Sequence, residues 1–246
     1  MSDRFPAPRA MTQRERYVKT LAFGQPDRIF YWFATPRQST INAWYRQGLP
    51  RMSDITDYGC PEEFYALVGM DRRLTLPIKT DTWPPFKVRV LEENAQGRIW
   101  VDEQGITMHD SGADLTTPGF RTRSYLSHPV RNREDWVRTR DGHFEPHTPG
   151  RYPDDWPAWV ERLKGRTLPL QVKIPGLYWK ARDWVGFEHL SLLFYDDPRL
   201  VHDMMEHLTE FAMSLLERAL REVEVDEAWI SEDMCFKNHA MISPQM

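Results

Sequence analysis

The chain has 246 residues, of which 41% are apolar, and a formal net charge of −4. These values suit one large globular domain. The slightly acidic balance gives no reason to expect nucleic acid or an anionic membrane as a partner. The apolar stretches are short and interrupted by charge, which argues against a membrane span or a signal peptide. With only Cys60 and Cys235, a disulfide scaffold is not expected and the cytoplasm is favoured.

The N-terminal third predicts short helices and strands. Residues 1–10 are expected to be disordered. Thr12 and Glu15 form a capping box, which predicts a helix that ends near Gly24. The apolar run at 28–33 predicts a strand buried on both faces. The pattern then predicts a short helix capped by Ser39 or Thr40 and ended by Gly48, a helix at 61–68 and a strand at 73–78.

The middle of the chain differs from both ends. Residues 87–110 alternate apolar and polar side chains, with turns at 94–97 and 104–105, which predicts an antiparallel meander. Residues 110–157 are rich in Pro, Gly, Arg and Asp and are expected to be irregular. We therefore interpret about 84–157 as an insertion between the units of an α/β fold.

The last third returns to an α/β rhythm. It predicts a strand at 168–174, helix through 177–194, a long amphipathic helix that begins at Asp197-Pro198, and a strand at 226–231 followed by a loop at 232–240. Ser243-Pro244 is a helix-start signal. The expectation is that this chain is the N-terminal part of a longer α/β protein, with the open sheet edge and exposed apolar face that favour a homo-oligomer.

Three stretches together resemble the uroporphyrinogen decarboxylase superfamily. They are MTQRERYVKTLAFGQPDRIFYWF, PGLYWKARDWVGFEHLSLLFYDDPRLVHDMMEHLTEFAMSLLERAL and DEAWISEDMCFKNHAMISPQM. The resemblance implies an incomplete (β/α)8 TIM barrel over 11–246, interrupted by the meander insertion. Members of this superfamily either decarboxylate acetate side chains of a tetrapyrrole without a cofactor or transfer methyl groups from corrinoid proteins to thiols with zinc.

Two departures bear on the chemistry. The decarboxylases carry an Arg-Gln-Ala-Gly-Arg-Tyr stretch after the first strand, and here only Arg37-Gln38 fits it. The zinc motif of the methyltransferases, His-x-Cys with a distant Cys, does not occur in this chain. That motif would lie in the part of a longer parent that is expected to follow, so its absence does not decide between the two chemistries. No metal site is expected in this chain, and zinc is expected only in a longer, methyltransferase-like parent. Cys235 and His239 supply two ligands, fewer than zinc requires.

Two groups of polar side chains are the candidate site. The first follows the strand at 226–231, because active sites of barrels lie at the carboxyl ends of the strands. It contains Asp233 as a catalytic residue and Glu232, Lys237 and Asn238 as substrate-binding residues; the alternative is a loop that caps the next helix. The second group follows the strand at 168–174 and contains Lys173, Tyr178 and Arg182.

Each member of the second group has an expected role and an alternative. Tyr178 is expected to be catalytic, as a proton donor or a stacking ring. Arg182 is expected to hold a substrate carboxylate by paired hydrogen bonds, as is Arg37. Surface ion pairing with Asp183 or Glu188 is the alternative for Arg182. Trp32 is expected to line the cavity, with core packing as its alternative.

The arginine-rich stretch from Arg121 to Arg140 is interpreted as a solvated surface, because Glu134, Asp135 and Asp141 are interspersed in it.

The function expected from these features is decarboxylation of a tetrapyrrole or another carboxylated small molecule, without a cofactor in this chain. A corrinoid-linked, zinc-requiring methyltransferase is the first alternative. An inactive fragment or a binding module is the second alternative.

Overall fold

The chain forms a mixed α/β structure. The computed structural model describes residues 11–33, 36, 38–52, 61–111 and 123–246. In chain order the elements are α1 (Gln13–Leu21), α2 (Gln38–Arg46), α3 (Glu62–Val68), β1 (Leu74–Thr75), β2 (Arg89–Asn94), β3 (Gly97–Val101), β4 (Thr107–Ser111), β5 (Arg123–Ser127), α4 (Arg133–His143), α5 (Trp156–Leu163), β6 (Leu170–Pro175), α6 (Leu177–Val185), α7 (Phe187–Asp196), α8 (Pro198–Glu222) and β7 (Glu227–Ser231).

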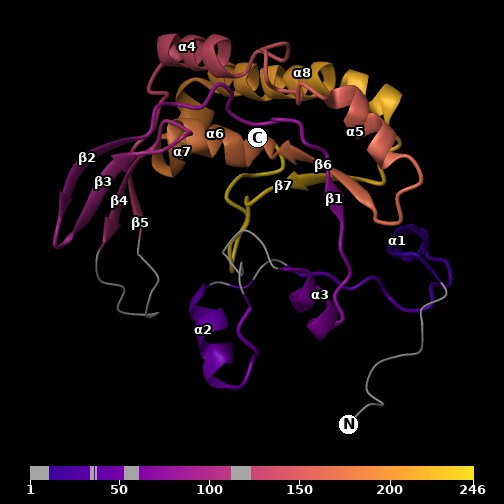
Figure 1. Cartoon of the computed structure of the whole chain (residues 1–246). Helices are drawn as coiled ribbons and strands as arrows, with labels where there is room; N and C mark the ends of the chain where they lie inside the picture. The colour runs from indigo at the N-terminus through magenta and orange to yellow at the C-terminus, as the bar shows by residue number, and fades with distance from the viewer. Residues whose placement is uncertain (1–10, 34–35, 37, 53–60, 112–122) are drawn as a thin grey trace.

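A parallel sheet of order β1-β6-β7 lies at the centre of the molecule. Helices α6, α7 and α8 lie on one side of it and α2 and α3 on the other, whereas α1 lies beside the amino ends of β6 and β7 (Figure 1). Side chains alternate along a strand. Leu170 and Val172 accordingly pack into the helix-side core, whereas Gln171 donates a hydrogen bond to Thr75 on the same row.

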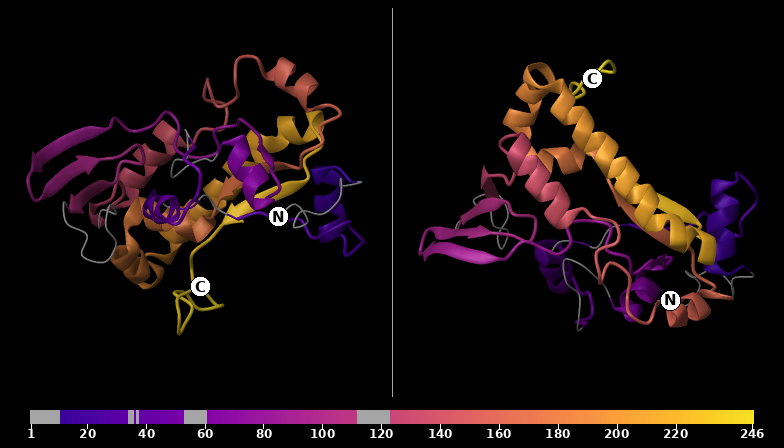
Figure 2. Two further views of the ribbon diagram at one scale, coloured as in Figure 1. Left: turned by 60° about the horizontal axis from the view of Figure 1, so that its bottom comes forward. Right: turned by 90° about the horizontal axis from the view of Figure 1, so that it is seen from above.

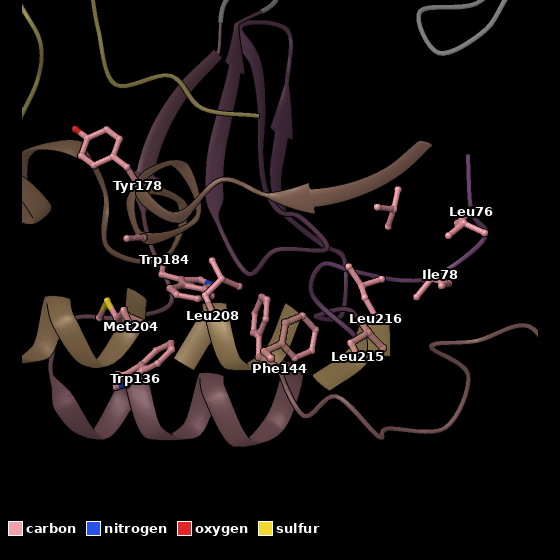
Figure 3. Packing of buried hydrophobic residues seen from close by; sticks show 14 of the residues in the cluster. Leu76, Ile78, Trp136, Phe144, Tyr178, Trp184, Met204, Leu208, Leu215 and Leu216 are labelled. Carbon is pink, nitrogen blue, oxygen red and sulfur yellow. The ribbon is translucent and has the colours of Figure 1, made fainter. Parts of the chain in front are cut away.

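The main core is built between this sheet and the helices. Trp136 of α4 and Phe144, the residue that follows α4, pack on Trp184 of α6, with ring centroids 4.8 Å apart in both pairs (Figure 3). Met204 and Leu208 of α8 are fully buried in the same cluster. The apolar stripe of α8 is thus core, as its helical spacing predicts.

The antiparallel sheet is a four-stranded meander of order β2-β3-β4-β5 that projects to one side of the molecule, as Figure 2 shows. The predicted turns lie between β2 and β3 and between β3 and β4. The sheet has one strand more than the alternation predicts, because β5 pairs with β4 from beyond residue 110.

Local signals correctly placed several helices. The Thr12 and Glu15 capping box is present at α1, and the Asp197 carboxylate accepts a hydrogen bond from Leu200 N at the start of α8. The helix predicted after Ser39 or Thr40 begins earlier, at Gln38. A helix at 61–68 is also confirmed, as α3.

Two predictions from the sequence are wrong. Residues 28–33 form no strand. Tyr31 N donates to the Asp71 carboxylate and Tyr31 O accepts from Asp71 N. The Tyr31 amide is therefore bonded to a side chain and not to the backbone of a neighbouring strand. Residues 110–157 are not irregular throughout, since β5 and α4 form there and α5 begins at Trp156.

The described strands form two open sheets and do not close into a barrel. Residues 1–10, predicted to be disordered, lie outside the described part of the chain. Across the described residues, no helix combines the length and apolar character needed to cross a membrane.

Candidate functional site

The carboxyl ends of β6 and β7 lie side by side, because Pro175 pairs with Ser231 in parallel register. The segments that follow both strands therefore leave the sheet at the same place. In parallel α/β folds this is the edge at which functional side chains gather.

Glu232 joins the two segments as a helix cap. Its carboxylate oxygens accept hydrogen bonds from Tyr178 N and Trp179 N, both at 2.9 Å. These are free amides in the first turn of α6, where negative charge is stabilised. Gly176 permits the approach, since a Cβ there would lie 2.0 Å from Ser231 O. The alternative to substrate binding at this position is a loop that caps the next helix. Glu232 does cap a helix, but it caps α6, which precedes it in the chain.

Arg182 and Asp233 are brought together, although they lie on different elements. Arg182 Nη2 lies 3.2 Å from Asp233 Oδ2, and Nη1 donates to Asp233 O at 3.1 Å. The guanidinium also lies over the Trp179 ring, 5.0 Å from its centroid. Neither Asp183 nor Glu188 takes the ion pair that the surface alternative for Arg182 required.

This pair lines a groove of about 840 Å³, which we call the strand-end groove. Its volume lies in the range of small-molecule sites. It lies between α6, the start of α7, the exit of β7 and strand β5 of the meander. The lining residues are Ile106, Tyr125, Leu126, His128, Trp179, Arg182, Asp183, Val185, Gly186, Phe187, Glu188, His189, Asp233 and Met241.

A buried lysine lies behind the groove. Lys180 Nζ lies 2.7 Å from Asp81 Oδ1 and 3.2 Å from Asp183 Oδ2. It also donates to Gln104 Oε1 at 3.1 Å. Burial raises the pKa of the Asp183 carboxyl, and the nearby Lys180 opposes that shift. A carboxyl with a raised pKa that faces a groove can carry a proton.

This cluster was missed in the sequence analysis. The spacing of Lys180 and Asp183, one turn apart on a helix that follows a strand end, is a signal that could have pointed to a pair. No sequence pattern points to Asp81, because the whole meander separates it from Lys180 in the chain.

His128 is a second residue that sequence reasoning missed. Its Nδ1 donates to the carbonyl of Asp183 at 2.9 Å, so Nε2 is left as the other ring atom for a ligand or proton. Gly186, at φ +89°, makes room for the ring, since a Cβ there would lie 2.6 Å from His128 Cδ2. The imidazole is thereby held at the wall of the strand-end groove.

Three predicted site residues lie outside the groove. Tyr178 is buried and lines a separate apolar pocket of about 360 Å³, and burial raises the pKa of its phenol. Trp32 packs edge-on against Trp229 at 5.5 Å. Lys173 Nζ lies 5.9 Å from the centroid of that same Trp229 ring. Trp32 and Lys173 thus belong to the face of the parallel sheet that the α6–α8 layer leaves uncovered.

The remaining predicted residues are scattered. Lys237 and Asn238 are exposed in the loop closed by the bridge between Cys235 and Ala240. Arg37 lies outside the described residues. Within the residues that the structure describes, no three His, Cys, Asp or Glu side chains are grouped as a metal site would need.

Comparison with known proteins returned no match: no family model, curated protein or solved structure matches this chain. The resemblance to the uroporphyrinogen decarboxylase superfamily therefore stays a prediction from the sequence.

Proposed function

We propose that this chain binds a carboxylated small molecule in the strand-end groove and promotes its decarboxylation without a cofactor, as the resemblance to the uroporphyrinogen decarboxylase superfamily implies. The observation that supports this best is the meeting of Arg182 and Asp233 at the carboxyl ends of β6 and β7. Functional side chains of barrels gather at this edge. There the Arg182 cation can bind a carboxylate group of the substrate, and the Asp233 carboxylate can stabilise a substrate ring that becomes positive.

Arg182 keeps donors for a substrate. A guanidinium has five N–H groups, and Asp233 takes one from Nη1 and one from Nη2. Nη1 also lies 4.0 Å from Met241 Sδ. The Nε–H and the second Nη2–H lie on one edge of the guanidinium, and these two donors can bind a substrate carboxylate side by side. The Trp179 ring under the guanidinium supports its orientation.

The proposed reaction removes CO2 from an acetate side chain and replaces it with one proton. Protonation of the substrate ring lets the C–C bond break, and its electron pair moves into the cationic ring as CO2 leaves. The exposed methylene carbon then takes a proton and the ring loses its own. Asp233 stabilises the positive ring in this scheme, and Asp183 supplies a proton because burial raises its pKa.

Tyr178 lies outside the strand-end groove and has no direct role in this proposal. Its hydroxyl lies 3.8 Å from Met241 Sδ, and Met241 also lines the strand-end groove. The phenol therefore contacts a lining residue of the strand-end groove but does not itself line that groove.

The same proposal treats β1, β6 and β7 as strands of a (β/α)8 barrel. Support comes from their parallel pairing and from the helices that cover one face of the sheet. Lys173 and Trp229 then lie on the face that points to the barrel interior.

Titration of a tetrapyrrole with several acetate side chains, followed by its absorbance, tests the binding step. Arg182→Ala should weaken binding by about tenfold or more, since a charge-assisted pair of hydrogen bonds is lost, and Arg182→Lys should restore part of it. Arg162→Ala removes a surface cation that pairs with Asp155 and is the control. Release of CO2 from the reduced tetrapyrrole tests the chemistry, and Asp233→Asn should slow it more than it weakens binding.

Failure of the parent chain to bind the tetrapyrrole, or equal binding by Arg182→Ala, would contradict the proposal. Methyl transfer to a thiol, in place of CO2 release, would favour the methyltransferase alternative.

A further inference from the structure

A second groove, of about 780 Å³, lies between the meander and α4; we call it the meander groove. One row of paired residues crosses all four strands and forms one wall. Arg89 pairs with Val101, Val101 with Thr107 and Thr107 with Ser127. Residues paired across antiparallel strands present their side chains on the same face, so this row faces a common space.

Helix α4 supplies the opposite wall. Asp135, Arg138 and Thr139 are three and four residues apart and share one face of the helix. Arg131 precedes the helix, and His143 is its last residue. Two separate elements therefore converge on the groove, which no single stretch of sequence would indicate.

The lining carries an excess of positive charge. Lys87, Arg89, Arg131 and Arg138 face one carboxylate, that of Asp135, so four cations less one anion leave a formal charge of about +3 with histidines neutral. Asp135 forms an ion pair with Arg138. In the described part of the chain no carboxylate forms an ion pair with the side chains of the other three cations.

Among the described residues, other arginines in the stretch from Arg121 to Arg140, unlike Arg131, form ion pairs with carboxylates. Arg123 pairs with Asp110, Arg133 with Asp203, and Arg140 with Asp141. Each of these three arginines thus has a carboxylate partner. Arg131 is exposed, as the interpretation of the stretch as a solvated surface expects, but it lines a common groove with Lys87 and Arg89.

Uncharged donors and a flat ring complete the lining. Thr107, Ser127 and Thr139 contribute hydroxyl groups. The Phe86 ring stacks on His143 with centroids 3.8 Å apart. Gly105, at φ +82°, lets this ring approach, since a Cβ there would lie 3.0 Å from it. The His143 ring is fixed by its Nδ1, which donates to Pro84 O at 2.6 Å.

We propose that the meander groove binds a small molecule that carries a phosphate or diphosphate group. A phosphate takes hydrogen bonds from several directions and carries more than one negative charge, which suits unpaired Lys and Arg side chains beside hydroxyl donors. The groove has room for more than the anion itself, and the Phe86 ring offers an apolar contact to the rest of such a ligand. This site does not depend on the proposed decarboxylation, since only His128 lines both grooves.

Calorimetric titration with pyrophosphate tests the proposal, with inorganic phosphate and citrate as parallel probes at constant ionic strength. Pyrophosphate should bind saturably at one site per chain, and more tightly than citrate. Lys87→Ala, Arg89→Ala and Arg131→Ala should each weaken it by about tenfold, since each removes a charge-assisted contact. All three side chains are exposed, so thermal melting should be unchanged.

Two control variants make the result specific. Arg199→Ala removes an exposed cation on α8, outside the meander groove, and should bind pyrophosphate as the parent does. Arg182→Ala, which alters the strand-end groove, should also bind it normally. Absence of saturable binding, citrate binding as tight as pyrophosphate, or an equal loss in Arg199→Ala would each overturn the proposal.

Discussion

The Glu232 carboxylate accepts a hydrogen bond from Trp179 N at 2.9 Å and so fastens the end of β7 to the first turn of α6. The neighbouring residue, Asp233, then lies next to Arg182 on the second turn of the same helix. The cap therefore positions the pair that lines the strand-end groove, and a residue expected to bind substrate has a structural role.

Glu232→Ala should lower the free energy of unfolding by about 1 kcal/mol, the usual cost of losing a helix cap. Glu232→Gln keeps one acceptor oxygen and should lose less. Urea unfolding curves compare the variants with the parent. If Glu232 instead acted mainly on substrate, ligand affinity would fall while the urea midpoint stayed in place.

Gly176→Ala should destabilise the chain by about 3 kcal/mol or prevent folding, because the new Cβ would meet Ser231 O and overpacking against backbone has no cheap relief. Gly142→Ala in α4 is the matched control, since nothing lies within 4 Å of its added Cβ. That change should stabilise the helix by about 0.5–1 kcal/mol. Thermal melting of both variants checks the pair, and equal melting temperatures would contradict it.

Lys180→Met should cost about 1–3 kcal/mol, since the half-exposed Asp81 and the more buried Asp183 would both lose their buried cation. Adding Asp183→Asn should recover part of the loss, because one of the two uncompensated carboxylates is then neutral. Denaturant titration of the single and double variants measures the coupling. Lys164→Met, which removes an exposed pair with Glu161, should change stability little.

Acidification should destabilise the α4–α8 contact through His207. Burial lowers the pKa of His207, although its hydrogen bond from Nε2 to Phe144 O opposes the shift. A histidine whose folded pKa lies below its unfolded value contributes stability above the unfolded pKa and loses it as pH falls through the folded one. Melting temperature measured from pH 7.5 down to 5 should fall, and His207→Gln should make the profile flatter. An unchanged profile in that variant would exclude His207 as the source.

The amino-acid sequence by itself determined the elements whose signals are local. The Thr12 and Glu15 box defines the start of α1, Asp197-Pro198 begins α8, and period-two alternation marks three strands of the meander. These signals are readable because the hydrogen bonds or side-chain periods that carry them span a few residues.

The tertiary structure alone decided what required partners far apart in the chain. The apolar run at 28–33 satisfies every requirement of a buried strand, yet the Asp71 carboxylate takes the amide that a neighbouring strand would need. Arg182 pairs with Asp233 in preference to nearby acids, and Lys180 meets Asp81 from beyond the meander. These pairings depend on which segments the parallel sheet and the helix layer bring within hydrogen-bond distance. The order of residue types along the chain does not specify the distance between segments that are far apart in the sequence.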